Sequence, residues 1–262
     1  MTPRLLLRGA LAPGYRSLDE AAAHYLRTVL RLRTGAEVEV FNGAGARCQA
    51  EIVAAQPETE GAAGRDRRSG NRSRRHPLGL ELRDPIIENP QPAHRILLGF
   101  ALLKAPATDE VLRKATELGA TDLLPLLTQR TQRGPTLARA ERSEHWAAVV
   151  SAAAAQCQQD HLPVLHAPAE LEHLLAGTRM PFPVAATHRL LLDPTGAVWP
   201  AALPPADTAL LLGPEGGWTQ EELARAEAVG WRVTRLGALV LRAETAPLAA
   251  LSWLAASWAA QP

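Results

Sequence analysis

The stretch Leu211-Leu212-Gly213-Pro214-Glu215-Gly216-Gly217-Trp218 decides the fold of this chain. The apolar run from Ala209 to Leu212 predicts a buried strand. The chain then turns through glycines, and Thr219 with Glu222 three residues later forms the capping-box pattern that begins a helix. Strand, glycine-rich turn and helix start are typical of α/β proteins, where such a turn brings backbone amides against a ligand. An ordinary strand-to-helix loop has the same outline, so the turn alone leaves both interpretations open.

A second informative segment follows the strand-like residues 231–234. It reads Leu236-Gly237-Ala238-Leu239-Val240-Leu241-Arg242-Ala243-Glu244-Thr245-Ala246-Pro247-Leu248-Ala249-Ala250, a glycine loop that leads into an alanine-rich helix. An arginine between apolar neighbours would need a partner or an anionic ligand, because an unpaired buried charge is costly. A structural ion pair would satisfy Arg242 equally well, and Glu244 could simply be an acid that the helix dipole favours at a helix start.

Together the two segments resemble the signature of the RsmE-type 16S rRNA uracil-N3 methyltransferases, a branch of the SPOUT superfamily. The matching positions are Gly213, Pro214, Glu215, Gly216, Gly217 and Trp218, then Leu236, Gly237, Leu241, Arg242, Glu244, Thr245 and Ala246. A third match is Lys114-Ala115-Thr116-Glu117-Leu118-Gly119, followed by Pro125-Leu126 and Arg130. The resemblance covers nearly the whole chain. One departure is Gln159, where the family commonly has an arginine.

The resemblance implies an α/β fold in two parts. Residues 1–84 would form a small PUA-like, RNA-binding β-barrel domain, and residues 93–262 a SPOUT methyltransferase domain whose parallel sheet contains a trefoil knot. The pattern after residue 92 agrees, because alternating strand-like and helix-like stretches favour a mostly parallel sheet with helices on both faces. Base rates by themselves speak against a knot. The predicted strands are 95–101, 122–127, 164–166, 184–187, 209–212 and 232–235; the predicted helices are 109–118, 137–158, 168–175, 220–229 and 245–259.

The sequence pattern of residues 1–84 predicts short strands, one helix at residues 18–30, and a hairpin at Asn42-Gly43. The segment 57–77 is rich in glycine, serine and arginine and predicts a flexible loop, although its arginines could also follow phosphates. Residues 1–76 carry 13 arginines against 8 acidic residues, whereas the remainder has 15 basic and 19 acidic residues. A basic front part suits a polyanion such as RNA, and a general bias toward arginine would give the same counts.

The resemblance also implies S-adenosylmethionine as the methyl donor and a uridine of 16S rRNA as the acceptor. Glycine loops suit the flat adenosyl group, because backbone groups can approach it closely. The candidate cofactor-binding residues are Leu212, Gly213, Pro214, Glu215, Gly216, Gly217, Leu236, Gly237, Leu241, Thr245 and Ala246, with Thr187 on a weaker third wall.

Arg242 and Glu244 are the candidate catalytic residues, because uracil N3 carries a proton that must leave before the nitrogen can attack. The forked guanidinium of Arg242 suits the uracil anion or a phosphate. Glu244 is a candidate base, but a helix start would favour its charged form and make it a weak one. Glu215 competes for that role, or fixes the turn by accepting backbone N–H bonds, and water is a further proton acceptor.

The candidate RNA contacts are basic residues in both parts of the chain. Each has an alternative role in packing or on a solvated surface. They are His24, Arg27, Arg31 and Arg33 in the front part, and Lys104, Arg113 and Arg130 in the rear part.

Several other classes find little support. The turn has neither a GxGxxG pattern nor the Gly-Lys-Ser/Thr ending of a P-loop, which argues against dinucleotide and nucleoside triphosphate sites. Cys48 and Cys157 lack CxxC spacing, so we expect no disulfide scaffold and no metal site. The apolar stretch near the N-terminus is too short for a signal peptide or a membrane span. We therefore expect a cytoplasmic protein without a membrane partner.

Two alternative functions stay open at this point. A SPOUT ribose 2′-O-methyltransferase acting on tRNA or rRNA usually has an asparagine-glutamate pair where this chain has Pro214-Glu215. A non-catalytic RNA-binding protein would keep the cofactor site without transferring a methyl group. The expected partner is 16S rRNA or the assembled small ribosomal subunit. We also expect a homodimer, with Trp253 and Trp258 either at its interface or in the core.

Overall fold

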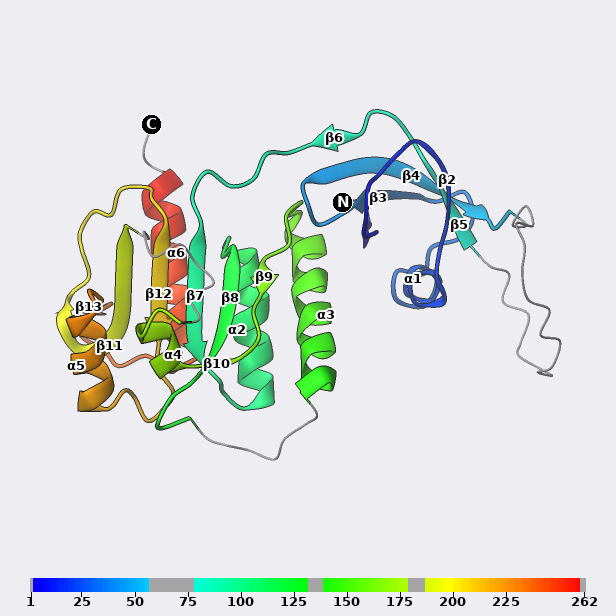
Figure 1. Ribbon diagram of the computed structural model, residues 1–262. Helices are drawn as coiled ribbons and strands as arrows, with labels where there is room; N and C mark the ends of the chain where they lie inside the picture. The colour runs from blue at the N-terminus through cyan, green and yellow to red at the C-terminus, as the bar shows by residue number, and fades with distance from the viewer. Residues whose placement is uncertain (1, 57–77, 132–138, 179–186, 260–262) are drawn as a thin grey trace. The chain divides into compact units, whose positions relative to one another are not determined.

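The computed structural model describes residues 2–56, 78–131, 139–178 and 187–259. Backbone contacts divide the chain into two compact units, Met1–Pro90 and Gln91–Pro262, and Figure 1 shows the elements of each. The predicted arginine-rich loop at 57–77 lies outside the described residues.

The first unit is built on a six-stranded sheet. Its order is β1 (Arg4–Leu6), β3 (Glu37–Phe41), β4 (Ala46–Ala54), β5 (Leu78–Leu82) and β2 (Gly14–Ser17), and β6 (Ile87–Glu88) pairs with β4. Strands β3 and β4 are antiparallel, so the predicted hairpin is confirmed. The Asn42 carboxamide oxygen accepts hydrogen bonds from the backbone N–H groups of Ala44 and Ala46, which fixes the turn.

One helical segment covers this sheet. Helix α1 (Glu20–His24) begins where the Asp19 carboxylate accepts the N–H of Ala22, and it continues as a π-helical turn, η1 (Tyr25–Val29). Leu26 is fully buried in a core that includes Val38 and Leu80. The predicted helix at residues 18–30 is thus confirmed in position, with a π-helical second half that its apolar spacing did not predict.

The second unit contains a seven-stranded sheet in which every pairing is parallel. Its order is β10 (Ala169–Glu170), β8 (Asp122–Leu127), β7 (Ile96–Ala101), β12 (Thr208–Leu212), β11 (His188–Val198) and β13 (Arg232–Arg235), and β9 (Val164–Leu165) pairs with β8. The predicted parallel sheet is confirmed. The trefoil knot stays a prediction.

Helices pack on both faces of this sheet because alternate strand residues point to opposite sides. Leu98 belongs to a core with α2 (Ala105–Glu117), α3 (Arg139–Cys157) and α6 (Thr245–Ala259). Its neighbour Leu97 belongs to a core with α4 (Leu171–Leu175) and α5 (Gln220–Ala228). The rings of Trp199 and Trp253 meet edge to face at 5.4 Å, and Trp258 donates its indole N–H to the carbonyl of Leu203. Both C-terminal tryptophans therefore contribute to packing within this unit.

The position of β11 corrects one prediction. Residues 184–186 lie outside the described residues, and Thr187 precedes the strand, which begins at His188. In the register of the sheet, Leu192 lies opposite Leu212 on one side and Thr234 on the other. The carboxyl ends of β11, β12 and β13 therefore meet at one edge, which is where ligands bind in open parallel sheets.

Candidate functional site

A cavity of about 570 Å³ opens at this edge of the second unit. Its walls come from the ends of the three strands, from the glycine turn at 213–217, from the loop at 236–244, and from the first turns of α2 and α6. The lining residues are Lys104, Ala107, Leu192, Asp193, Pro194, Leu212, Gly213, Pro214, Glu215, Gly217, Trp218, Thr234, Arg235, Leu236, Gly237, Leu239, Val240, Leu241, Arg242, Ala243, Glu244 and Ala246.

The glycine turn is packed on the ring of Trp218. A Cβ atom added at Gly213 would lie 3.0 Å from that ring, so a larger residue would have to displace it. Trp218 is buried and donates its indole N–H to the carbonyl of Leu192 at 2.9 Å. Gly217 has a φ of 68°, a left-handed conformation that glycine adopts without strain. Glycine is therefore favoured at 217 by the backbone conformation and at 213 by the packing of the Trp218 ring.

Two side chains fix the turn from outside. Arg130 donates from one Nη atom to the carbonyls of Gly216 at 2.7 Å and Trp218 at 3.2 Å. Glu222 is buried and accepts the N–H of Thr219 at 2.8 Å and the N–H of Gln129 at 2.9 Å. The predicted capping box of α5 is confirmed, and its acid also connects the turn to the loop after β8.

Glu215 does not fix the turn. Its side chain is exposed and makes no hydrogen bond with the described residues, so that interpretation is wrong. The turn is closed instead by a backbone bond from the N–H of Gly217 to the carbonyl of Pro214 at 2.8 Å.

The loop at 236–244 is exposed along much of its length. Leu239 is 82% exposed and Val240 is 77% exposed. The Arg242 side chain is 85% exposed, and its Nη1 lies 3.9 Å from Oε1 of Glu244. The sequence interpretation treats Arg242 as a buried charge, and this is wrong, because the apolar neighbours of Arg242 also face solvent rather than the core. Arg242 is therefore an accessible cation at the rim of the cavity.

Most of the predicted cofactor-binding residues line this cavity, and three do not. Gly216 lies against the Arg130 side chain, and Thr245 is the first residue of α6. Thr187 lies before β11, at the opposite end of the strand from the cavity, so the third wall was predicted in the wrong place. That wall is formed by Leu192, Asp193 and Pro194.

The predicted RNA contacts are distributed over both units. His24 and Arg27 lie on the helical segment of the first unit, and Arg31 and Arg33 follow it. In the second unit Lys104 lines the cavity, and Arg113 pairs with Glu110 on the exposed side of α2. Arg130 uses one Nη atom for both of its hydrogen bonds to the glycine turn.

Asp193, Thr234 and Arg235 are polar residues of the cavity that the sequence interpretation missed. The signal for Asp193 was present, since the apolar run Leu190–Leu192 ends in Asp193-Pro194 much as Leu210–Leu212 ends in Gly213-Pro214. The predicted strand at 184–187 ends before β11 begins, so Asp193 is not recognised as a residue of the strand. Thr234 is fully buried, and its hydroxyl oxygen has no hydrogen-bond partner among the described residues.

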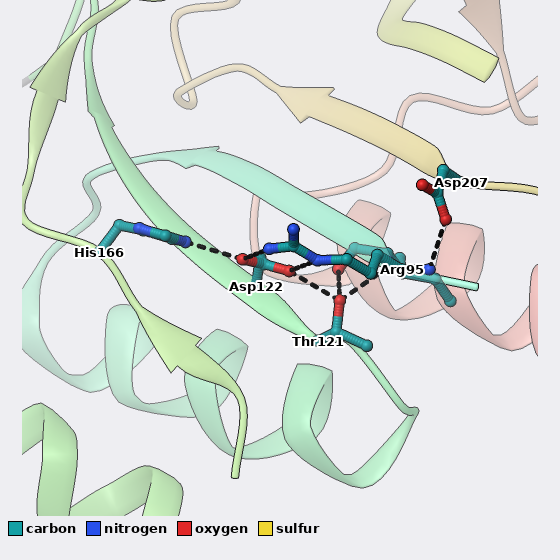
Figure 2. Close-up of polar contacts among 6 residues, drawn as sticks. Arg95, Thr121, Asp122, His166 and Asp207 are labelled. Carbon is teal, nitrogen blue, oxygen red and sulfur yellow. Dashed lines mark hydrogen bonds and ion pairs between the residues drawn. The ribbon is translucent and has the colours of Figure 1, made fainter. Parts of the chain in front are cut away.

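A separate polar cluster lies at the amino-terminal ends of the strands of the same sheet, where β8 begins (Figure 2). Asp122 is buried and accepts hydrogen bonds from Arg95, Thr121 and His166. Burial by itself raises the pKa of Asp122, but the hydrogen bonds from His166, Arg95 and Thr121 outweigh it and hold that pKa below its usual value. The backbone N–H of Arg95 also donates to Asp207, so the cluster connects β7, β8 and the segments before β12 and after β9.

Among residues 2–56, 78–131, 139–178 and 187–259, no group of three or more His, Cys, Asp or Glu is arranged to hold a metal ion. The helices in these same ranges include none that is long and apolar enough to cross a membrane.

Comparisons with known proteins identify the family. Residues 89–255 match the RNA methyltransferase domain, and residues 18–59 match the RNA methyltransferase PUA domain. The ribosomal RNA small subunit methyltransferase E of Synechocystis is 33% identical over 90% of this chain and 71% of its own. A methyltransferase from Legionella pneumophila, solved in complex with the bound cofactor SAM, is 26% identical with a TM-score of 0.81 over 98% of both chains. A ribosomal RNA small subunit methyltransferase E from Neisseria gonorrhoeae, bound to S-adenosyl methionine, has the same fold at 23% identity, with a TM-score of 0.79 over 98% of both chains. The chain therefore belongs to the ribosomal RNA small subunit methyltransferase E family.

Proposed function

We propose that this protein transfers a methyl group from S-adenosylmethionine to N3 of a uridine in 16S rRNA. The observation that supports this most strongly is the cavity bounded by the glycine turn and the loop at 236–244, because both segments carry the RsmE motif residues. The relatives' name specifies small-subunit ribosomal RNA. The choice of uracil N3 follows from the resemblance of the motifs.

The residues around the cavity fit the proposed methyl donor. A volume of about 570 Å³ lies within the range of roughly 300–1,000 Å³ that is usual for small-ligand sites. Leu212, Leu236 and Leu241 offer apolar surface to an adenosyl group. Gly213 and Gly217 line the cavity without side chains, which would let backbone groups approach a ligand closely. The buried Thr234 hydroxyl has no hydrogen-bond partner among the described residues, and a polar ligand atom would supply one.

The role of the protein is to hold the uracil in line and to let its N3 proton leave. When bound, S-adenosylmethionine supplies a methyl group on a positively charged sulfur. Orienting the reactants can contribute about 7–11 kcal/mol to lowering the barrier. We assign Arg242 to the uracil anion or to a neighbouring phosphate, because its guanidinium is accessible at the cavity rim. Glu244 lies close enough to orient that guanidinium, and it is also a candidate base.

RNA contacts are assigned to basic side chains that remain accessible. In the second unit these are Lys104 at the cavity, Arg113 on α2, and the edge of Arg130 that the turn does not use. In the first unit they are His24, Arg27, Arg31 and Arg33. We propose either 16S rRNA or the assembled small ribosomal subunit as the partner, in the cytoplasm.

We also propose that the protein acts as a homodimer. The exposed apolar side chains of Leu239 and Val240 suit contact with a second copy. Sedimentation equilibrium of the wild type and of Val240→Ser tests this. A monomeric wild type would contradict the homodimer.

Deletion of the gene tests the proposed function in cells. Mass spectrometry of nucleosides from 16S rRNA should show loss of 3-methyluridine, and a plasmid copy should restore it. Loss of a 2′-O-methylated nucleoside instead would indicate the ribose enzyme. An unchanged set of modified nucleosides, with a purified protein that still binds the cofactor, would indicate the non-catalytic alternative.

A further inference from the structure

Asp193 is a buried carboxylate in the wall of the cavity. It lies within β11, directly after the apolar residues 190–192, and only 8% of its surface is exposed. Its Oδ1 accepts two hydrogen bonds from Thr195, one from the backbone N–H at 2.8 Å and one from the hydroxyl at 2.6 Å. These bonds fix the orientation of the carboxyl group. They involve neither a cation nor Oδ2.

No ion pair joins Asp193 to any described residue. Three basic residues line the same cavity, namely Lys104, Arg235 and Arg242, and the ion pair that Arg242 makes there is with Glu244. A buried carboxylate without a cationic partner is costly, because it has lost water without gaining an opposite charge. A ligand that brings a positive charge into the cavity would supply the missing partner.

We propose that Asp193 binds a positive charge of the methyl donor. This inference rests on the proposed function, which makes S-adenosylmethionine the ligand. That molecule carries two positive charges that a carboxylate could bind, the sulfonium and the α-ammonium. A carboxylate at the sulfonium would also favour release of the spent cofactor, because methyl transfer converts the sulfonium into a neutral thioether.

Three ligands separate the possibilities in a calorimetric binding experiment. S-adenosylmethionine carries both charges, S-adenosylhomocysteine keeps only the ammonium, and 5′-methylthioadenosine has neither. Each is titrated into the wild type, into Asp193→Asn, which removes the charge at constant size, and into Asp193→Ser, which removes it with a smaller side chain. Glu227→Gln is the matched control, since Glu227 is an exposed acid on α5 whose loss changes the net charge equally.

Removing the Asp193 charge should weaken S-adenosylmethionine binding by about tenfold or more, as expected for the loss of a charge-assisted contact, and leave 5′-methylthioadenosine binding unchanged. If S-adenosylhomocysteine binding is also unchanged, the charge that Asp193 binds is the sulfonium. If it falls equally, the charge is the ammonium. Equal weakening of all three ligands, or no weakening of any, would overturn the proposal.

The same data distinguish this inference from the proposed function. A wild type that binds none of the three ligands contradicts the proposed function itself. A wild type that binds them, with variants whose affinities for the three ligands fall equally or not at all, contradicts only the role of Asp193. Unchanged binding of 5′-methylthioadenosine also shows that the variant cavity is intact.

Discussion

The indole N–H of Trp218 donates a hydrogen bond of 2.9 Å to the backbone carbonyl of Leu192. This bond joins the glycine turn after β12 to the middle of β11, so two walls of the cavity are fixed relative to each other. The same ring occupies the space beside Gly213 that a Cβ would need. Local packing under the turn thus determines the geometry of the proposed cofactor site.

Trp218→Phe should destabilise the protein and weaken cofactor binding together. Phenylalanine keeps much of the packing, but the Leu192 carbonyl loses the indole donor, and losing one such hydrogen bond costs about 0.5–1.5 kcal/mol. Urea denaturation measures the loss of stability, and calorimetry measures the affinity for S-adenosylmethionine. Trp253→Phe is the control, since Trp253 meets Trp199 edge to face and its indole N–H makes no hydrogen bond within the described part of the chain. Equal effects of the two variants on stability and on binding would show that the bond to Leu192 has no special role.

Arg130→Met should weaken cofactor binding by about tenfold, because two charge-assisted bonds to carbonyls of the turn are lost. Methionine preserves the length and the apolar stem of the side chain, so the change isolates the guanidinium. Arg225→Met removes an exposed arginine on α5 that pairs with Glu172, and it should leave the affinity unchanged. If Arg130→Met reduced RNA binding without any change in cofactor affinity, Arg130 would act on RNA alone.

Asp122→Asn should lower the free energy of unfolding in a pH-dependent way. Its hydrogen bonds hold the pKa of Asp122 below the unfolded value, so folding disfavours protonation of this carboxyl. The stabilisation is complete above the unfolded pKa, which is about 3.9, and is lost as the pH falls through the lower folded pKa. We expect a difference of about 1–3 kcal/mol near neutral pH.

Denaturant titrations of the wild type and of Asp122→Asn at several pH values check this expectation. The difference between them should be constant near neutrality and should shrink only in the acid range below the usual carboxyl pKa. A difference that grew on acidification would contradict the assigned direction of the pKa shift.

Arg242→Ala should slow methyl transfer without changing cofactor affinity. The exposed guanidinium lies at the cavity rim, where it would act on RNA rather than on the cofactor. Loss of one such electrostatic group typically lowers the rate about 100-fold. Single-turnover methylation measures the effect, with Arg232→Ala on β13 as an exposed control. An unchanged single-turnover rate with normal cofactor binding would remove Arg242 from the mechanism.

The sequence predicted the elements that carry their own local signals. The capping-box residues Thr219 and Glu222 correctly predict the start of α5, and β8, β13 and α6 have the predicted bounds. Helix α2 begins four residues before its predicted start, because Pro106 fits the first turn of a helix, where no backbone N–H is needed. Apolar periodicity does not show where a helix begins when its first turn is exposed, as it is in α2.

The cavity was only partly predictable because its walls come from strands that are distant in sequence. The glycine turn and the second loop were identified by their motifs. Asp193 was missed because β11 was placed one segment too early, and Arg242 was expected to be confined when its neighbours are in fact exposed. The register that sets Leu192 between Leu212 and Thr234 is a tertiary property, and no local pattern specifies it.

The most direct test of the central claim is methyl transfer by the purified protein. Small ribosomal subunits from a strain that lacks the gene are incubated with the protein and S-adenosylmethionine that carries a deuterated methyl group, and the 16S rRNA nucleosides are identified by mass spectrometry. A reaction without protein provides the background. We predict label in 3-methyluridine and in no other nucleoside. Label in a 2′-O-methylated nucleoside, or no label in 16S rRNA although the protein binds the cofactor, would contradict the account.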